Sequence, residues 1–227
     1  MKIIAIGAHP DDLEIYMGGT IAAFLAQGDE VMPVIATDGA KGGKGDPAEL
    51  VRTRRIEAGN AAAVFGLAPT MLGFPDGGLR ADGPVIDRIA ALSAAERPTL
   101  VITHAPNDYH GDHRALSDAV RIAASFVAPV MWMETTMGVG FTPTHYIDVT
   151  AYMALKREAI RKHASQNPER FVDMAELGGR YRAAQCNDTR GYAEVFRFEP
   201  VFPFADPRNL LPPAPGVLPV RDRRTAH

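Results

Sequence analysis

Short apolar runs alternate with longer amphipathic segments along most of the chain. Continuous apolar runs, which are typical of strands buried on both faces, predict strands at residues 2–8, 31–36, 70–74, 99–103, 129–133 and 146–149. Apolar residues at helical spacing predict helices at residues 20–27, 48–65, 85–95, 112–126 and 151–163. This alternation predicts an α/β fold: a Rossmann-like three-layer sandwich with a mostly parallel sheet.

The composition changes at the C-terminal end. Residues 200–227 hold seven of the chain's 18 prolines and favour neither a helix nor a central strand. We therefore expect one domain over residues 1–199 and a Pro-rich tail over residues 200–227. The tail also carries apolar residues, so we expect it to pack on the body or across a subunit interface, with a partly disordered terminus as the alternative. These apolar residues are Val201, Phe202, Phe204, Leu210 and Leu211.

Composition and charge exclude several classes of protein. With 46% apolar and 22% charged residues, the chain is typical of a globular protein, and its net charge of -3 does not favour nucleic-acid binding. No apolar run reaches the length of a membrane span, and the N-terminus does not resemble a signal peptide. A single cysteine, Cys186, permits no internal disulfide and fits a reducing compartment. We expect a cytoplasmic homo-oligomer with no nucleic-acid or membrane partner.

Acidic and imidazole side chains cluster after two of the predicted strands. "AHPDD" follows the first strand, and "NDYHGDH" follows the strand at residues 99–103. The carboxyl ends of parallel strands meet at one edge of a sheet, where ligands bind. We therefore expect one shared site built from both clusters.

Three of these residues make a plausible set of metal ligands. His9, Asp12 and His113 offer two imidazoles and one carboxylate, which suits zinc with an open position for water, or ferrous iron as the alternative. Asp11 is left beside the metal as a candidate general base. His110 lies one helical turn from His113 and could polarise a carbonyl or protonate a leaving group, with Asp112 fixing its tautomer. An isolated "DD" after a strand is more often a helix cap, so the interpretation depends on both clusters together.

The remaining histidines are weaker candidates. We place His104 outside the site, and His145 and His163 at its rim. Asp38 is expected to cap its loop and Trp132 to lie in the core.

The segments "AHPDDLEIYMGGTIA" and "NDYHGDHRAL" resemble the two signature motifs of the PIG-L/LmbE family of zinc-dependent N-deacetylases. Weaker similarity extends over residues 1–200. The resemblance implies that His9, Asp12 and His113 bind zinc and that Asp11 is the general base. It also implies that His110, with Asp112 as its partner, stabilises an oxyanion or acts as an acid. Arg54 matches a residue that contacts substrate.

The implied reaction is removal of an N-acetyl group from an N-acetylglucosamine-type amino sugar or glycoconjugate. Hydrolysis of another amide, such as a thiol-sugar conjugate or a non-sugar N-acyl intermediate, is the alternative. A non-catalytic nucleotide-binding module, suggested by the Gly-rich "TDGAKGGKGD", is a further alternative. The chain differs from the usual family pattern at Tyr16-Met17, Gly111 and Glu134. The first and third differences bear on the pocket and the substrate rather than on the reaction, and Gly111 loosens the turn but keeps both imidazoles.

Overall fold

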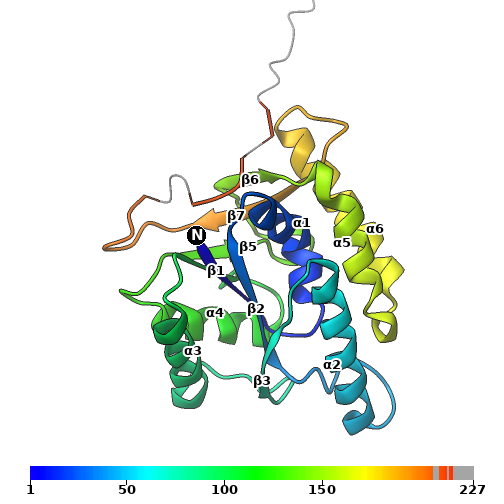
Figure 1. Ribbon diagram of the computed structural model, residues 1–227, viewed down its shortest axis with the longest axis vertical. Helices are drawn as coiled ribbons and strands as arrows, with labels where there is room; N and C mark the ends of the chain where they lie inside the picture. Colours follow the sequence, from blue (N-terminus) through cyan, green and yellow to red (C-terminus); the bar gives the residue numbers. More distant parts are fainter. Residues whose placement is uncertain (207–209, 214, 217–227) are drawn as a thin grey trace, which may run out of the picture.

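A seven-stranded sheet forms the middle layer of the protein, with the strand order β3-β2-β1-β4-β5-β7-β6 (Figure 1). The computed structural model describes residues 1–206, 210–213 and 215–216. The strands are β1 (Lys2–Gly7), β2 (Glu30–Thr37), β3 (Thr70–Phe74), β4 (Leu100–His104), β5 (Val130–Met133), β6 (His145–Asp148) and β7 (Ala193–Phe198). Strands β1 to β5 pair in parallel, whereas β7 runs antiparallel to both β5 and β6. The predicted three-layer α/β fold is therefore confirmed.

Helices cover both faces of this sheet (Figure 1). The α-helices are α1 (Asp12–Ala26), α2 (Pro47–Val64), α3 (Gly83–Glu96), α4 (Gly111–Ala123), α5 (Met153–Arg161) and α6 (Pro168–Gln185). Helices α3 and α4 pack together on one face, and α5 packs against α1, α2 and α6 on the other. Alternate residues of β1 serve the two layers: Ile3 joins the cluster under α1, and Ile4 joins the cluster under α3 and α4. Burial on both faces explains why β1 has no polar alternation.

Helix α1 begins eight residues before the predicted start at residue 20, because Gly18 and Gly19 do not form a turn. They allow close packing instead. A Cβ atom on Gly19 would lie 2.5 Å from Val149 Cβ, and one on Gly18 would lie 3.2 Å from Lys156 Cγ. The helix is instead interrupted at Met17 (φ -145°, ψ 20°). Glu194 accepts hydrogen bonds from the backbone N–H groups of Gly19 and Thr20, and so caps the second half of α1.

Two elements were not predicted. Helix α6 follows Pro168 and packs on α5, and β7 inserts between β5 and β6 as an antiparallel strand.

Part of the expected tail packs on the body. Leu210 and Leu211 contact the core cluster under α1, and the Asp148 N–H donates to the Pro213 carbonyl over 3.0 Å. In contrast, Phe202 is 85% exposed. Residues 207–209, 214 and 217–227 of the tail lie outside the described residues, and the domain boundary at residue 199 stays a prediction. Within the described part of the chain, no helix has both the length and the apolar character that crossing a membrane requires.

Candidate metal and catalytic site

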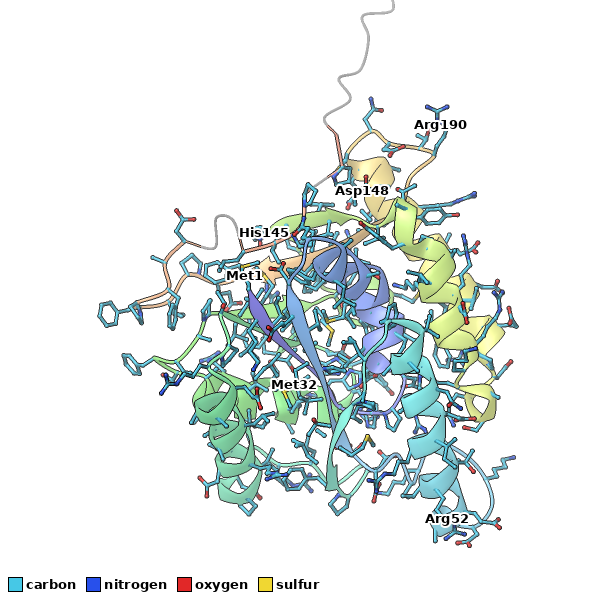
Figure 2. The ribbon with its side chains drawn as sticks, viewed as in Figure 1. Met1, Met32, Arg52, His145, Asp148 and Arg190 are labelled. Carbon is cyan, nitrogen blue, oxygen red and sulfur yellow. The ribbon has the colours of Figure 1, made fainter. Side chains whose placement is uncertain are left out.

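The site lies where four parallel strands end. Residues 8–12 follow β1, Asp38 follows β2, Asp76 follows β3, and residues 105–113 follow β4. Figure 2 labels His145 in the upper half of the molecule near Met1, and Arg52, near the start of α2, at the opposite end. Met1 precedes β1, so it marks the amino edge of the sheet. His145 contacts Thr144 and Phe198 and has no contact with the site residues.

Three ligand atoms of His9, Asp12 and His113 form a nearly equilateral triangle. His9 Nδ1 lies 3.3 Å from Asp12 Oδ2, His113 Nε2 lies 3.4 Å from the same oxygen, and the two ring nitrogens lie 3.3 Å apart. A tetrahedral zinc ion with bonds of about 2.0–2.1 Å places neighbouring ligand atoms about 3.3–3.4 Å apart. The spacing and the mixed nitrogen and oxygen donors therefore fit a small divalent ion.

Carboxylates stand behind both imidazoles. His9 Nε2 lies 3.3 Å from Asp112 Oδ2 and 3.3 Å from Asp76 Oδ1, and His113 Nδ1 lies 3.4 Å from Asp108 Oδ1. Such partners orient a ligating histidine and increase its basicity. Sequence reasoning missed Asp76 and Asp108 as partners, although "NDYHGDH" contains Asp108 and "PDGG" contains Asp76.

The clustered carboxylates favour positive charge in the site. Burial opposes a charge on His9, but hydrogen bonds to Asp112, Asp12 and Asp76 raise its pKa to about 12. Burial also opposes a charge on His113, but Asp12 and Asp108 raise its pKa to about 9. The carboxylates thus stabilise positive charge at the centre of the cluster. A divalent ion would supply this charge in place of protons on the imidazole rings.

Neighbouring side chains offer other groupings of ligand atoms. These are His9, His110 and His113; Asp12, His104 and His113; and His9, Asp76 and Asp112. In the last group, backbone N–H groups of Lys41 and Gly77 already donate to Asp76 and Asp112. The triangle of His9, Asp12 and His113 is favoured because each of its rings keeps a carboxylate behind its other nitrogen.

Asp11 lines the cavity beside this triangle, and one of its carboxylate oxygens is paired with Arg54. Its backbone is left-handed (φ 117°), and Arg54 Nη2 donates to Asp11 Oδ2 over 2.9 Å. Arg54 also donates to the carbonyls of Pro10 and Gly39 and is only 3% exposed. Burial and the charge of Asp12 raise the pKa of Asp11 to about 7, while Arg54 lowers it. The expected substrate contact of Arg54 therefore competes with three internal partners, and its clearest contact is with the candidate base.

His110 is held in one tautomer. The backbone N–H of Asp112 donates to His110 Nδ1 over 3.2 Å, so the neutral ring carries its proton on Nε2. Burial, His9 and His113 lower the pKa of His110, which favours the neutral form. We expected the side chain of Asp112 to fix the tautomer of His110, but the contact comes from the backbone N–H group of Asp112. The carboxylate of Asp112 accepts from Gly77 N and Leu79 N and faces His9, because α4 turns this side chain toward the loop after β3.

His104 belongs to the site, contrary to expectation. It is fully buried, its ring stacks on His113 with centroids 3.7 Å apart, and its Nε2 lies 3.0 Å from Asp12 Oδ2. The missed signal is its position as the last residue of β4, where the side chain faces β1. Burial and then His113 lower the pKa of His104 to about 4, so it is a neutral neighbour of Asp12.

His163 is buried rather than at the rim. Its exposed fraction is 1%, and its Nε2 lies 3.2 Å from Glu14 Oε2. Trp132 lies in the core, as predicted. Asp38 accepts hydrogen bonds from Ala40 N and Asp76 N, which agrees with the predicted loop cap.

A cavity of about 690 Å³ opens over the cluster. His9, Asp11, Asp12, His110 and His113 line it, together with further residues of α1, α5 and α6. Tyr16 of α1 also lines it, and its hydroxyl lies 2.8 Å from Thr136 Oγ1. The cavity is large enough for a sugar-sized ligand beside the ligand triangle.

The fold and site place the chain in a class of α/β proteins, and comparison with known proteins identifies its family. The fold is that of an α/β protein whose ligand site lies at the carboxyl edge of the sheet, and the His/Asp cluster there offers the donor atoms that a metal ion would need. The family model described as PIG-L, GlcNAc-PI de-N-acetylase, matches residues 4–124, and the chain belongs to this family. The chain is 30% identical to the diacetylchitobiose deacetylase of Thermococcus kodakarensis over 90% of this chain and 87% of the relative. The chain is accordingly related to deacetylases, as the sequence motifs predict.

Solved structures resemble the chain over most of its length. An N,N'-diacetylchitobiose deacetylase from Pyrococcus horikoshii has a TM-score of 0.76 and 26% identity, and the likeness covers 87% of this chain and 83% of that one. The 4-carboxy-2-hydroxymuconate hydratase GalB from Pseudomonas putida has a TM-score of 0.77 at 24% identity, covering 88% of this chain and 97% of that one. The second likeness concerns the fold alone, so the reaction has to be argued from the site.

Proposed function

We propose that the chain removes the N-acetyl group from an N-acetylglucosamine-type amino sugar or glycoconjugate and releases acetate and the free amine. The observation that carries this proposal is the ligand triangle of His9 Nδ1, Asp12 Oδ2 and His113 Nε2, with Asp11 and His110 beside it. Membership of the PIG-L family and the similarity to diacetylchitobiose deacetylases support the same reaction.

The three triangle atoms would hold Zn²⁺, with Fe²⁺ as the alternative occupant. A divalent ion there supplies Lewis acidity, which lowers the pKa of water and polarises an amide carbonyl. Asp108, Asp76 and Asp112 keep the two imidazoles oriented with one nitrogen toward the centre.

Asp11 accepts the proton of the attacking water. Arg54 holds its Oδ2, which leaves Oδ1 to take the proton, and a pKa near 7 allows the group to accept and later return a proton at neutral pH. The proton then passes to the amine nitrogen as the C–N bond breaks. His110 donates the proton on Nε2 as a hydrogen bond to the carbonyl oxygen while negative charge develops on it.

The test is metal analysis combined with acetate release. Purified protein should contain about one equivalent of zinc or iron per chain and should release acetate from a panel of N-acetylated sugars. A protein without stoichiometric metal and without amidase activity would favour the alternative of a binding module. Acetate release only from non-sugar amides would favour the other hydrolase alternative.

We also propose that the protein is a cytoplasmic homo-oligomer. The single cysteine supports the cytoplasmic compartment. Light scattering of the purified chain measures the oligomeric state directly.

A further inference from the structure

One face of α6 lines the cavity instead of packing on protein. Phe171, Met174, Ala175, Gly178 and Tyr181 are spaced at three- and four-residue intervals, and all five line the cavity. The buried residues of α6 are Val172, Gly179, Arg182 and Ala183, of which Gly179 and Arg182 also line the cavity. A helix normally turns its apolar stripe toward the core. The stripe that α6 turns toward the cavity is only partly covered by protein: Phe171, Met174, Ala175 and Gly178 are half-buried and Tyr181 is exposed. A ligand in the cavity would bury it further.

Large apolar side chains are also exposed at the mouth of this cavity. Leu177 is 64% exposed, Tyr181 59%, Met137 48% and Tyr109 89%, and all four line the cavity. Exposed apolar groups that gather around one opening, rather than scattering over the surface, are typical of ligand-binding grooves. Opposite α6, the wall is completed by Ile15 and Tyr16 of α1 and Met153 of α5.

The charged side chains in this part of the cavity are largely committed to each other. Lys156 Nζ lies 2.5 Å from Glu194 Oε1, and Arg182 donates to Glu134 through Nε over 2.8 Å. Arg182 Nη1 donates to Gln185 as well. Each of these two cations is paired with a buried or half-buried carboxylate, and the wall around them consists mainly of apolar side chains.

We infer that the stripe of Phe171, Met174, Gly178 and Tyr181 on α6 binds an apolar aryl or alkyl substituent on the amine side of the substrate. This inference rests on the proposed function only in taking the ligand to be an N-acetylated amino sugar. The stripe runs from Phe171 to Tyr181, ten steps along the helix or about 15 Å. An acetyl group offers one methyl and cannot cover such a wall, so the substituent belongs to the part of the substrate that becomes the amine.

The test compares glycosides of N-acetylglucosamine that carry methyl, butyl and hexyl groups. Burying one methylene strengthens binding about fourfold, so partial burial of the hexyl chain should raise kcat/KM about tenfold over the methyl glycoside, mainly through KM. N-hexanoylglucosamine serves as the opposite arm. If kcat/KM rises with the length of the N-acyl chain and not of the glycoside, the substituent lies on the acyl side and the inference is overturned.

Variants of the wall provide the second arm. Met174→Asn and Leu177→Asn should remove most of the preference for the hexyl glycoside, measured in each variant as the ratio of kcat/KM for the hexyl glycoside to kcat/KM for the methyl glycoside. Leu155→Asn on α5 is the matched control, because Leu155 is also an exposed leucine on a helix but does not line the cavity. Equal preference in all three variants and the unmodified protein would overturn the inference.

Calorimetry with hexyl glucoside, which has no amide, separates this inference from the proposed function. Binding that weakens in Met174→Asn and not in Leu155→Asn supports the apolar wall even if no acetate is ever released. Acetate release from methyl and hexyl glycosides at equal kcat/KM, together with no binding of hexyl glucoside, supports the deacetylase and overturns the wall.

Discussion

Replacing Asp11 by asparagine should separate metal binding from catalysis. Asparagine has nearly the same size and tolerates the left-handed backbone that Asp11 adopts at φ 117°, so the turn before α1 should survive. The substitution removes the proton acceptor and keeps the ligand triangle. We expect metal content to stay near one equivalent and kcat to fall about 10²- to 10⁴-fold, the usual contribution of a general base.

The structural effect of Asp11→Asn can be estimated from the partners of Arg54. The guanidinium loses its ion pair to Asp11 but keeps hydrogen bonds to the Pro10 and Gly39 carbonyls. Because two of its three partners remain, the free energy of unfolding should fall by about 1–3 kcal/mol rather than by the larger amount expected for an isolated buried charge. Urea unfolding measures this change, and Asp118→Asn on the exposed face of α4 is the matched control.

Asp12→Asn should behave in the opposite way. It weakens the oxygen donor of the triangle, so the protein should lose metal on dialysis and recover part of its activity in excess zinc. Metal content by mass spectrometry and acetate release distinguish the two variants. If Asp11→Asn loses its metal while Asp12→Asn retains it, the assignment of the two carboxylates is reversed. If both variants keep full activity, the deacetylase proposal is refuted.

Three further predictions concern buried charges near the site. Arg54→Gln should raise the pKa of Asp11 further, because Arg54 lowers it now; the acidic limb of the pH profile of kcat/KM should move to higher pH, whereas exposed Arg52→Gln should leave it in place. Lys156→Met should lower the free energy of unfolding by about 3–5 kcal/mol, since it leaves Glu194 buried without its cation; urea unfolding should show partial recovery when Glu194→Gln is added, and an unchanged midpoint would contradict the argument. Burial opposes a charge on His163, but Glu14 raises the pKa of His163. This pair therefore stabilises the fold fully below the unfolded pKa of about 6.5 and loses that contribution as the pH rises through the raised folded pKa. Metal-free protein should unfold in less urea at about pH 9 than at about pH 6, and His163→Gln should reduce this difference.

The convergence of the two motifs was predictable because it follows from topology. In a parallel sheet every carboxyl end lies at the same edge, so His9 after β1 and His113 after β4 had to come close once the strands were placed. The partners behind them were not predictable in this way. Asp76 reaches His9 from the loop after β3, and His104 reaches Asp12 from inside β4; both contacts depend on side-chain directions that periodicity does not encode.

The glycines of α1 illustrate why local patterns misplace element boundaries. Gly18-Gly19 has the composition of a turn, but glycine is needed at these positions because Val149 and Lys156 pack closely against them. Both residues belong to elements more than a hundred residues away in the chain. Helix α6 and β7 were overlooked for a related reason. One apolar face of α6 is directed at a cavity, and β7 is an inserted antiparallel strand, so neither fits the alternation that predicts a parallel βα unit.

The backbone at Asp11 explains how two adjacent carboxylates can serve different purposes. Asp11 precedes α1 with a left-handed φ of 117°, and the two carboxylates have different partners: Asp12 meets His104 and His113, whereas Asp11 meets Arg54. Although burial opposes its charge, Asp12 has a pKa held well below the ordinary value by His113 and His104, whereas burial and Asp12 itself raise the pKa of Asp11 to about 7. Backbone strain of this kind costs on the order of 1–3 kcal/mol and persists where the surroundings enforce it. The two different environments are what the proposed roles require: Asp12 keeps the charge that a metal ligand needs, and Asp11 titrates in the range that a general base needs.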